Sequence, residues 1–411
     1  MINLFFNWLI ALTVFSAPVT ALMLPHGGTA NYVVLILLGM VTGWGQIKKF
    51  TQFETLFFAG LLILFLVNIV SFTQTENISG GYSWMGKYLY LFLGLFAYAV
   101  IKDKYQFLAK YFDLFLVLNA ALIGGVAAYQ YYYLNIPRIY GYSHPILYAD
   151  VSMALAGVIL CRMFFSRTHW VLYPAFVACI IAAVLTQTRG ALIALPVILV
   201  TLFFLTKAYQ NKKLLLLTFI MAGLFVASIT MKESPISYRF TSTADQMKNL
   251  FSSSAQIQTA PPFLRMEFWK NSYILWKTNP VLGIGPGDYN IEMKRLVDSG
   301  KSINTSDMNY NWTPHSNIVN SLVTSGITGL IAFLMATLLW PLILINKFKI
   351  SNDHSSCFIV VLVSYFIFGI TTTWLATHAG FSIFMILLLI SMPQMSLNDS
   401  SYDNETLTGK V

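Results

Sequence analysis

The sequence predicts an all-α, polytopic membrane protein, and three observations support that prediction. Hydrophobic residues make up 57% of the 411 residues and charged residues only 10%, against about 25% charged residues in ordinary soluble domains. Apolar runs of roughly 18–20 residues, long enough to span a bilayer, recur along the chain. Basic residues gather in alternate connections between these runs, as the positive-inside rule requires. We therefore expect a bundle of membrane-spanning helices.

Hydropathy predicts about twelve spans. The first, Ile2–Leu24, has neither a basic leader nor an A-x-A cleavage site before a soluble chain, so we interpret it as a span and not as a cleaved signal peptide. The other spans are expected at Tyr32–Gln46, Glu54–Phe72, Trp84–Ile101, Tyr105–Tyr131, Ile146–Phe165, Trp170–Gln187, Gly190–Lys207, Lys213–Met231, His315–Ile345, Ser355–Thr373 and His378–Met392.

The distribution of basic residues favours a cytoplasmic N-terminus. In that orientation the inner connections contain Lys48, Lys49, Lys102, Lys104, Lys110, Arg162, Arg167, Lys207, Lys212, Lys213, Lys347 and Lys349. The short outer connections contain little beyond Lys87, Arg138 and Arg189. Both termini are then cytoplasmic. This divides the chain into spans one to nine (residues 1–231), one large outer loop (232–314), spans ten to twelve (315–392) and a short tail (393–411).

The outer loop contains one clear helix pattern. Residues 263–278 are expected to form a helix that stops before Asn279-Pro280. Leu264, Phe268 and Leu275 share one face at helical spacing, and Arg265 and Trp269 lie on another. The glycine-rich stretch that follows, residues 281–289, is interpreted as a turn, because a proline interrupts it and no βαβ unit surrounds it.

The transition from this loop to the tenth span is the first candidate site. Thr313 is a candidate N-cap and Pro314 suits the first helical position, which places His315 in the first turn. The positive end of a helix disfavours imidazolium, so His315 would be neutral and able to accept a proton. The same helix end attracts anions such as phosphate. The alternative is an interfacial histidine without a catalytic role.

Arg189 lies in a short outer connection between two apolar runs, beside Gln187. An arginine close to the hydrocarbon is costly and suggests a functional site, although snorkelling to lipid headgroups is an alternative. Arg265 has a weaker case by itself, since loop arginines are often simply solvated. Further outer-face residues that could line a cavity are Arg138, Tyr142 and His144, and Asp150 is a candidate counter-ion for an arginine.

Several function classes lose support from what the sequence lacks. The three cysteines have no C-x-x-C spacing, and the outer loop has no Asp-x-Asp pair or His/Cys cluster, so no metal site is predicted. There is no Walker loop, and the spans carry few carboxylates, which disfavours an ATP motor and a proton-coupled pump. We predict no cofactor and no nucleic-acid partner. A histidine base with two arginines, which can grip a diphosphate bidentately, instead suggests group transfer from a polyprenyl diphosphate.

Four segments carry a family resemblance: residues 186–191 (TQTRGA), the loop with Arg265, residues 279–289 (NPVLGIGPGDY) and residues 314–317 (PHSN). In this order they resemble the O-antigen ligase and polymerase superfamily of bacterial envelopes, and the resemblance covers the whole chain in topology. It implies a GT-C-like fold and a metal-independent, inverting glycosyltransferase. Asn317 follows Ser316 here, whereas the histidine and the asparagine are more commonly adjacent.

The resemblance also implies roles and partners. His315 would be the base, Arg189 and Arg265 would hold the donor diphosphate, and Gln187, Arg138, Tyr142 and Asn317 would be candidate lining residues. A ligase would transfer a glycan from undecaprenyl diphosphate to a lipid A–core sugar on the periplasmic face of the inner membrane, among membrane lipids. The same residues would serve an O-antigen polymerase. A lipid-linked oligosaccharide flippase is the alternative from another class, but charges through the middle of several spans would then be expected.

Overall fold

The computed structural model describes residues 2–165, 169–205, 261–303, 313–348, 350 and 353–392. All regular structure within these ranges is helical, which confirms the predicted all-α class for the described chain. The predicted span Lys213–Met231, the first part of the predicted outer loop and the predicted tail lie outside these ranges.

The helices follow the predicted spans closely. They are α1 (Ile2–Met23), α2 (Gly27–Thr42), α3 (Trp44–Ile47), α4 (Gln52–Phe72), α5 (Ile78–Asp103), α6 (Tyr105–Ala128), α7 (Pro145–Phe165), α8 (His169–Leu185), α9 (Arg189–Leu192), α10 (Ala194–Leu205), α14 (Pro261–Trp276), α15 (Tyr289–Asp298), α17 (Asn317–Leu334), α18 (Trp340–Lys347) and α19 (Asp353–Thr371). One π-turn extends α6 and another joins α17 to α18. The last helix is His378–Met392.

Within the described ranges, six helices are long and apolar enough to cross a membrane, with α17 and α18 counted together as Asn317–Lys347. Five shorter apolar helices accompany them: Gly27–Thr42, Trp170–Leu185, Arg189–Leu205, Ser355–Thr371 and His378–Met392. The protein is therefore a multi-pass membrane protein. The central element is α7, because 83% of its most apolar window is buried inside the protein.

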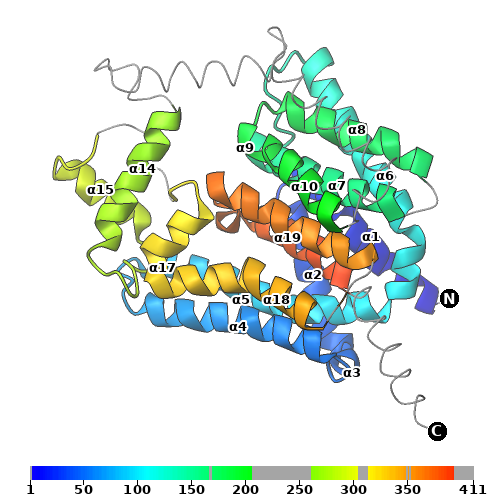
Figure 1. The fold of residues 1–411 in the computed structure, drawn as a ribbon, viewed down its shortest axis with the longest axis horizontal. Coiled ribbons are helices and arrows are strands. Elements are labelled where there is room, and N and C mark those ends of the chain that lie inside the picture. The colour runs from blue at the N-terminus through cyan, green and yellow to red at the C-terminus, as the bar shows by residue number, and fades with distance from the viewer. Residues whose placement is uncertain are drawn as a thin grey trace.

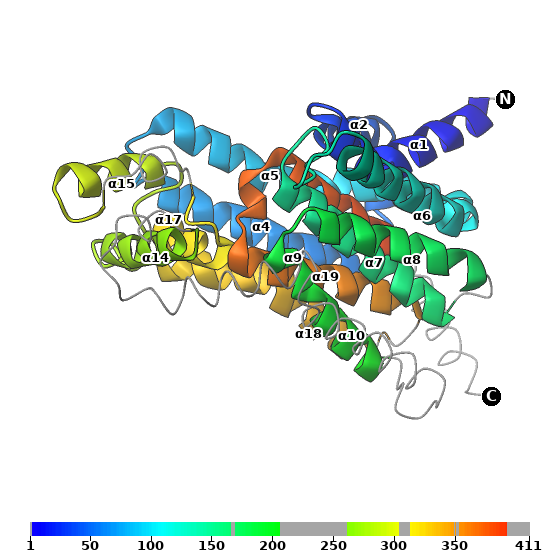
Figure 2. The ribbon, with the colours of Figure 1, turned by 90° about the horizontal axis from the view of Figure 1, so that it is seen from above.

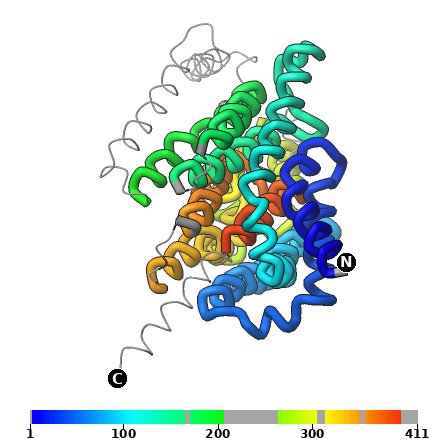
Figure 3. Tube along the Cα trace, turned by 90° about the vertical axis from the view of Figure 1, so that its right-hand side faces the viewer, coloured from blue at the N-terminus to red at the C-terminus, as the bar shows by residue number. Residues whose placement is uncertain are grey.

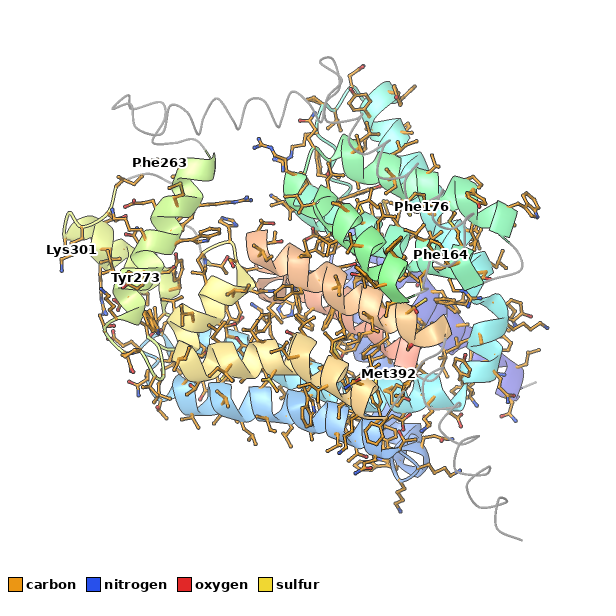
Figure 4. All side chains as sticks on the ribbon, in the orientation of Figure 1. Phe164, Phe176, Phe263, Tyr273, Lys301 and Met392 are labelled. Carbon is orange, nitrogen blue, oxygen red and sulfur yellow. The ribbon has the colours of Figure 1, made fainter. Side chains whose placement is uncertain are left out.

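The bundle has two distinct ends, and only one of them carries α14 and α15 (Figures 1 and 2). We call the end that carries α14, α15 and the start of α17 the loop end, and the opposite end, near α3, the α3 end. Phe263, Tyr273 and Lys301 lie at the loop end, whereas Met392 lies toward the α3 end (Figure 4). Seen along the bundle, α1 and α2 lie on one flank and α10 on the opposite flank (Figures 2 and 3).

At the loop end, connections from distant parts of the chain are joined by backbone hydrogen bonds. Tyr142 N donates to Leu22 O at 2.8 Å, which joins the connection before α7 to the end of α1. Ile139 N donates to Leu185 O at 3.4 Å and joins the same connection to the end of α8. These bonds fix the loops on which the predicted site residues lie.

The glycine-rich stretch after α14 is a structural turn, as predicted, and it packs against a break in α17. Gly326 adopts φ 66°, ψ −165° inside α17 and interrupts the helix there. At this break, backbone groups of α17 form hydrogen bonds with the glycine-rich turn. Ile284 N donates to Val323 O, and Ile327 N donates to Pro280 O. A methyl group at Gly326 would lie 2.1 Å from Val281 O, so only glycine permits this approach.

The turn also holds α14 and α15 onto the bundle. The carboxylate of Asp288 accepts hydrogen bonds from the backbone N–H groups of Glu76 and Asn77, at 2.7 and 2.8 Å, in the connection between α4 and α5. A small apolar cluster then joins α14, α15 and α17; it contains Leu264, Phe268, Leu275, Tyr289, Met293, Leu296 and Val323. The predicted buried face of the loop helix is thus confirmed.

Candidate functional site

The start of α17 differs from the prediction. The helix begins at Asn317, and Ser316 is its N-cap, with Ser316 Oγ accepting from Val319 N at 3.4 Å. His315 is therefore not in the first helical turn: it precedes the cap in a left-handed conformation with φ 54°. The reason is that Pro314 O accepts a bond from Trp269 Nε1 at 3.0 Å, and the first helical bond runs instead from Asn320 N to Ser316 O.

His315 is held by α14 of the loop. Its ring lies 5.7 Å from the ring of Phe268, centroid to centroid, and the neighbouring residue Trp269 binds Pro314. The imidazole is half-buried. An imidazole fixed between a helix start and an aromatic pair has little freedom to move, which suits a group that must meet a substrate atom in one geometry.

Arg265 lies one helical turn before these aromatic residues on α14. It precedes Phe268 by three residues and Trp269 by four, spacings at which side chains of a helix are neighbours. Burial lowers the pKa of the Arg265 guanidinium. No ion pair of Arg265 occurs among the described residues. A guanidinium that is partly desolvated without a carboxylate is well suited to bind an anionic group.

Arg189 is the first residue of α9, after an extended Thr188 and a left-handed Gln187 with φ 56°. The following residue, Gly190, packs tightly against the end of α19: a methyl group there would lie 2.2 Å from Thr371 Oγ1. The position of Arg189 is therefore fixed by α19 and not only by its own loop.

The end of α19 also receives the start of α17. Ser316 Oγ donates to Gly369 O at 3.2 Å, and Asn317 Oδ1 accepts from Leu375 N at 3.4 Å, just after α19. Gly369 and Thr371 are two residues apart on α19, so this helix end contacts the segments that carry His315 and Arg189. The three principal predicted residues therefore lie on segments that meet at the loop end: α14 contacts the segment with His315, and the end of α19 contacts the segments with His315 and Arg189.

The predicted lining residues differ in their environments. Arg138 Nε donates to Thr186 O at 3.1 Å, and Gln187 Nε2 donates to Pro137 O at 2.6 Å, so these two side chains join the loops on either side of α7 and α8. The side chain of Tyr142 is 61% exposed. Asn317 is fully buried and joins α17 to the segment after α19.

Two further outer-face predictions also have a clear location. His144 Nδ1 accepts from Ile146 N at 3.2 Å at the start of α7, and burial, with a smaller contribution from Arg138, lowers the pKa of its imidazole. Asp150 is 4% exposed within α7 and interacts with Thr372. It makes no ion pair with an arginine among the described residues, which contradicts the prediction that it is a counter-ion.

Sequence reasoning missed the aromatic support of the histidine. The helical spacing placed Phe268 on one face and Trp269 on another, whereas both contact the segment that carries His315. The signal was present in the sequence, because two adjacent aromatic residues follow Arg265 by one helical turn.

No group of three or more metal-ligating side chains occurs within the described ranges. Chemically, the arrangement combines a proton acceptor with two guanidinium groups that can bind an anionic leaving group.

Two comparisons with known proteins show what the chain is similar to. Residues 174–334 match the family model described as O-Antigen ligase, a range that contains Arg189, Arg265 and His315. The chain is also similar to an uncharacterized protein of Haemophilus influenzae, with 24% identity over 384 residues, which cover 88% of this chain and 92% of the relative. The segment that carries all three residues is thus similar to the O-antigen ligase family.

Proposed function

We propose that the protein is an O-antigen ligase of the bacterial inner membrane. It transfers a glycan from undecaprenyl diphosphate to a sugar of the lipid A–core, on the periplasmic face, with both termini in the cytoplasm. The family match and the multi-pass fold support this proposal.

In this reaction the oxygen of the acceptor hydroxyl attacks the anomeric carbon of the donor sugar. His315 accepts the hydroxyl proton as the new C–O bond forms. The bond between the anomeric carbon and the diphosphate oxygen breaks with inversion, and its electron pair leaves with the undecaprenyl diphosphate. Arg189 and Arg265 stabilise the charge that develops on this leaving group, so that no metal ion is needed.

The observation that carries the proposal is the contact between α14 and the histidine segment. Trp269 binds Pro314 and Phe268 packs on His315, so the helix with the half-buried Arg265 is held beside the proposed base. A diphosphate gripped by the arginine would therefore place its reacting sugar close to the imidazole.

The test is the envelope glycolipid profile of a deletion strain that is complemented with wild type or with His315→Ala. For a ligase, the deletion strain has core lipid without long glycan and accumulates polymerised glycan on the polyprenyl carrier. Wild type restores transfer and His315→Ala does not, although the variant remains in the membrane.

An O-antigen polymerase remains the second candidate, because the base and the diphosphate-binding arginines serve both reactions. The same profile separates the two. If single repeat units still reach the lipid in the deletion strain but chains do not lengthen, the protein is a polymerase.

Metal independence has its own test. Chelators added to purified protein, with donor and acceptor lipid, are expected to leave the rate unchanged. Inhibition that is reversed by adding a divalent cation would contradict the proposed mechanism.

A further inference from the structure

A second group of basic side chains lies at the loop end, on elements that the proposed mechanism does not use. The group consists of His26 between α1 and α2, Lys87 on α5 and His378 at the start of the last helix; we call it the Lys87 cluster. Three segments far apart in sequence contribute one residue each. Lys87 and His26 each contribute to the electrostatic environment of His378, so both lie within electrostatic range of its imidazole.

An aromatic contact one helical turn deeper fixes this arrangement. The ring of Phe381 is stacked on Tyr90 of α5 at 6.1 Å and also contacts Tyr32 of α2. Lys87 precedes Tyr90 by three residues, and His378 precedes Phe381 by three. Because α5 and the last helix both begin at the loop end, one turn back along each helix brings Lys87 and His378 toward one another.

The turn that carries His26 is packed against the helix His378–Met392. His26 adopts φ 58° and is followed by Gly27 and Gly28. A methyl group at Gly28 would lie 3.3 Å from Ile383 Cδ1, so the end of α1 and the start of α2 lie close to the last helix. His26 therefore lies on a third segment that borders the cluster.

Lys87 is the unusual member. Its side chain is only 7% exposed, and its Nζ lies 4.4 Å from the ring centroid of Trp84. Within the described ranges no carboxylate pairs with it. Lysine is almost never buried unless it is paired, because the lost hydration of the ammonium group must be replaced. Two histidines beside it add further positive charge when they are protonated.

A bound anionic ligand would offset the positive charge of the Lys87 cluster. The oxygens of a phosphate group can accept hydrogen bonds from an ammonium and two imidazoles at once, and the negative charge replaces repulsion by attraction. The cluster lies near the ends of membrane-crossing helices and beside a tryptophan, where lipid headgroups are found. Basic pockets between membrane helices bind phosphate-bearing headgroups for the same reasons. A cation is disfavoured by the ammonium group.

We propose that His26, Lys87 and His378 form a binding site for the phosphate group of an anionic lipid. The site is separate from the base and the arginines of the proposed transfer reaction. The ring of Trp84 contacts Lys87, and the buried ring of Phe381 contacts His378.

The experiment measures the thermal stability of the purified full-length protein during titration with short-chain phosphatidic acid, short-chain phosphatidylcholine or inorganic phosphate. We expect saturable stabilisation by phosphatidic acid and none by phosphatidylcholine. Lys87→Met retains the apolar stem and should weaken the apparent affinity about tenfold or more, the effect of losing one charge-assisted hydrogen bond. His378→Gln, at an exposed position, provides a second variant in which the same weakening is expected.

Lys277→Met is the matched control. Lys277 Nζ lies at the same 4.4 Å from an aromatic ring, that of Tyr273, but the lysine is exposed. Its replacement should leave the lipid affinity unchanged, as should His315→Ala, so failure of the proposed base and failure of this site can be told apart. If inorganic phosphate stabilises the protein as strongly as phosphatidic acid, and Lys87→Met weakens both, the site takes free phosphate. Equal responses to both lipids, or unchanged affinity in Lys87→Met and His378→Gln, would overturn the proposal.

Discussion

Charged side chains have different partners at the two ends of the bundle. At the α3 end, three carboxylates each meet a cation: Glu54 with Lys102 at 2.6 Å, Asp103 with Lys104 at 2.7 Å and Asp113 with Arg162 at 2.8 Å. At the loop end, Arg265 and Lys87 are partly or fully buried and meet aromatic rings or neighbouring helices rather than carboxylates of the described chain.

One arginine of the loop end resembles those of the α3 end. Arg295 on α15 pairs with Glu76 at 2.6 Å and with Glu292, and so joins α15 to the connection between α4 and α5. It shows that the loop end can use carboxylates where a cation is structural. The comparison therefore separates cations that pair with carboxylates from Arg265 and Lys87, for which we propose anionic ligands.

Among the substitutions that test this comparison, those at the two arginines of the proposed site should have the largest effect, which is a loss of transfer rate. Arg265→Lys and Arg189→Lys keep the charge but lose the planar fork that grips a diphosphate, so the transfer rate should fall by about 100- to 1,000-fold. The rate is measured with purified protein and lipid-linked donor. Arg295→Lys is the control and should retain activity; activity retained in both site variants would refute the diphosphate role.

The next effect concerns stability at the α3 end. The fully buried Glu54 accepts hydrogen bonds from Lys102, from the Tyr98 hydroxyl and from Thr51 N. Glu54→Gln removes the charge that pairs with Lys102 and should lower the free energy of unfolding by about 3 kcal/mol. Thermal unfolding in detergent measures this loss. Activity per folded molecule should stay the same, and a selective loss of activity would show that the two ends do not divide their roles in this way.

A third prediction tests how the loop end is attached. Gly326→Ala would place a methyl group 2.1 Å from Val281 O, so the turn before α15 must move away from α17. Stability should fall by about 2 kcal/mol, and activity should fall with it because α14 shifts relative to His315. Gly300→Ala is the matched control, since Gly300 has a similar φ of 70° but nothing within 4 Å of an added methyl group. Equal effects of the two variants would mean that backbone strain, and not the close approach, decides the outcome.

The smallest expected effect is a pH dependence at His144. Burial and Arg138 lower its pKa below the ordinary 6.5. The unfolded chain then binds more protons than the folded one, so this histidine reduces stability progressively as the pH falls below about 6.5. His144→Asn retains an acceptor for Ile146 N and should unfold with a weaker pH dependence between pH 7 and 5. Parallel curves for variant and wild type would contradict this assignment.

The sequence predicted the helices well, because hydropathy reports directly on which segments cross a membrane. Each predicted span within the described ranges falls on one or more helices, six of which are long and apolar enough to cross a membrane, and the apolar face of α14 was identified from its spacing. The prediction from the sequence failed where contacts between distant parts of the chain decide the local structure. The start of α17 is displaced because Trp269, far earlier in the chain, takes Pro314 O as its acceptor.

The break at Gly326 and the burial of Lys87 were missed for the same reason. A helix break that is stabilised by a turn some forty residues earlier leaves no local signal beyond the glycine itself, as the bond from Ile327 N to Pro280 O illustrates. Lys87 was counted with the basic residues of the outer connections, whereas its side chain is buried and lies within electrostatic range of His378. Candidate residues can thus be chosen from their chemistry, but their surroundings depend on packing.

The most direct test of the central claim is transfer of glycan from undecaprenyl diphosphate to lipid A–core by purified wild type, His315→Ala and His144→Asn at neutral pH. The two histidines lie at the same end of the bundle, but only His315 is next to α14. We predict that His315→Ala loses about 100-fold or more of the rate, the size of a general-base contribution, and that His144→Asn retains it. Equal rates for His315→Ala and wild type would show that the proton acceptor is another group.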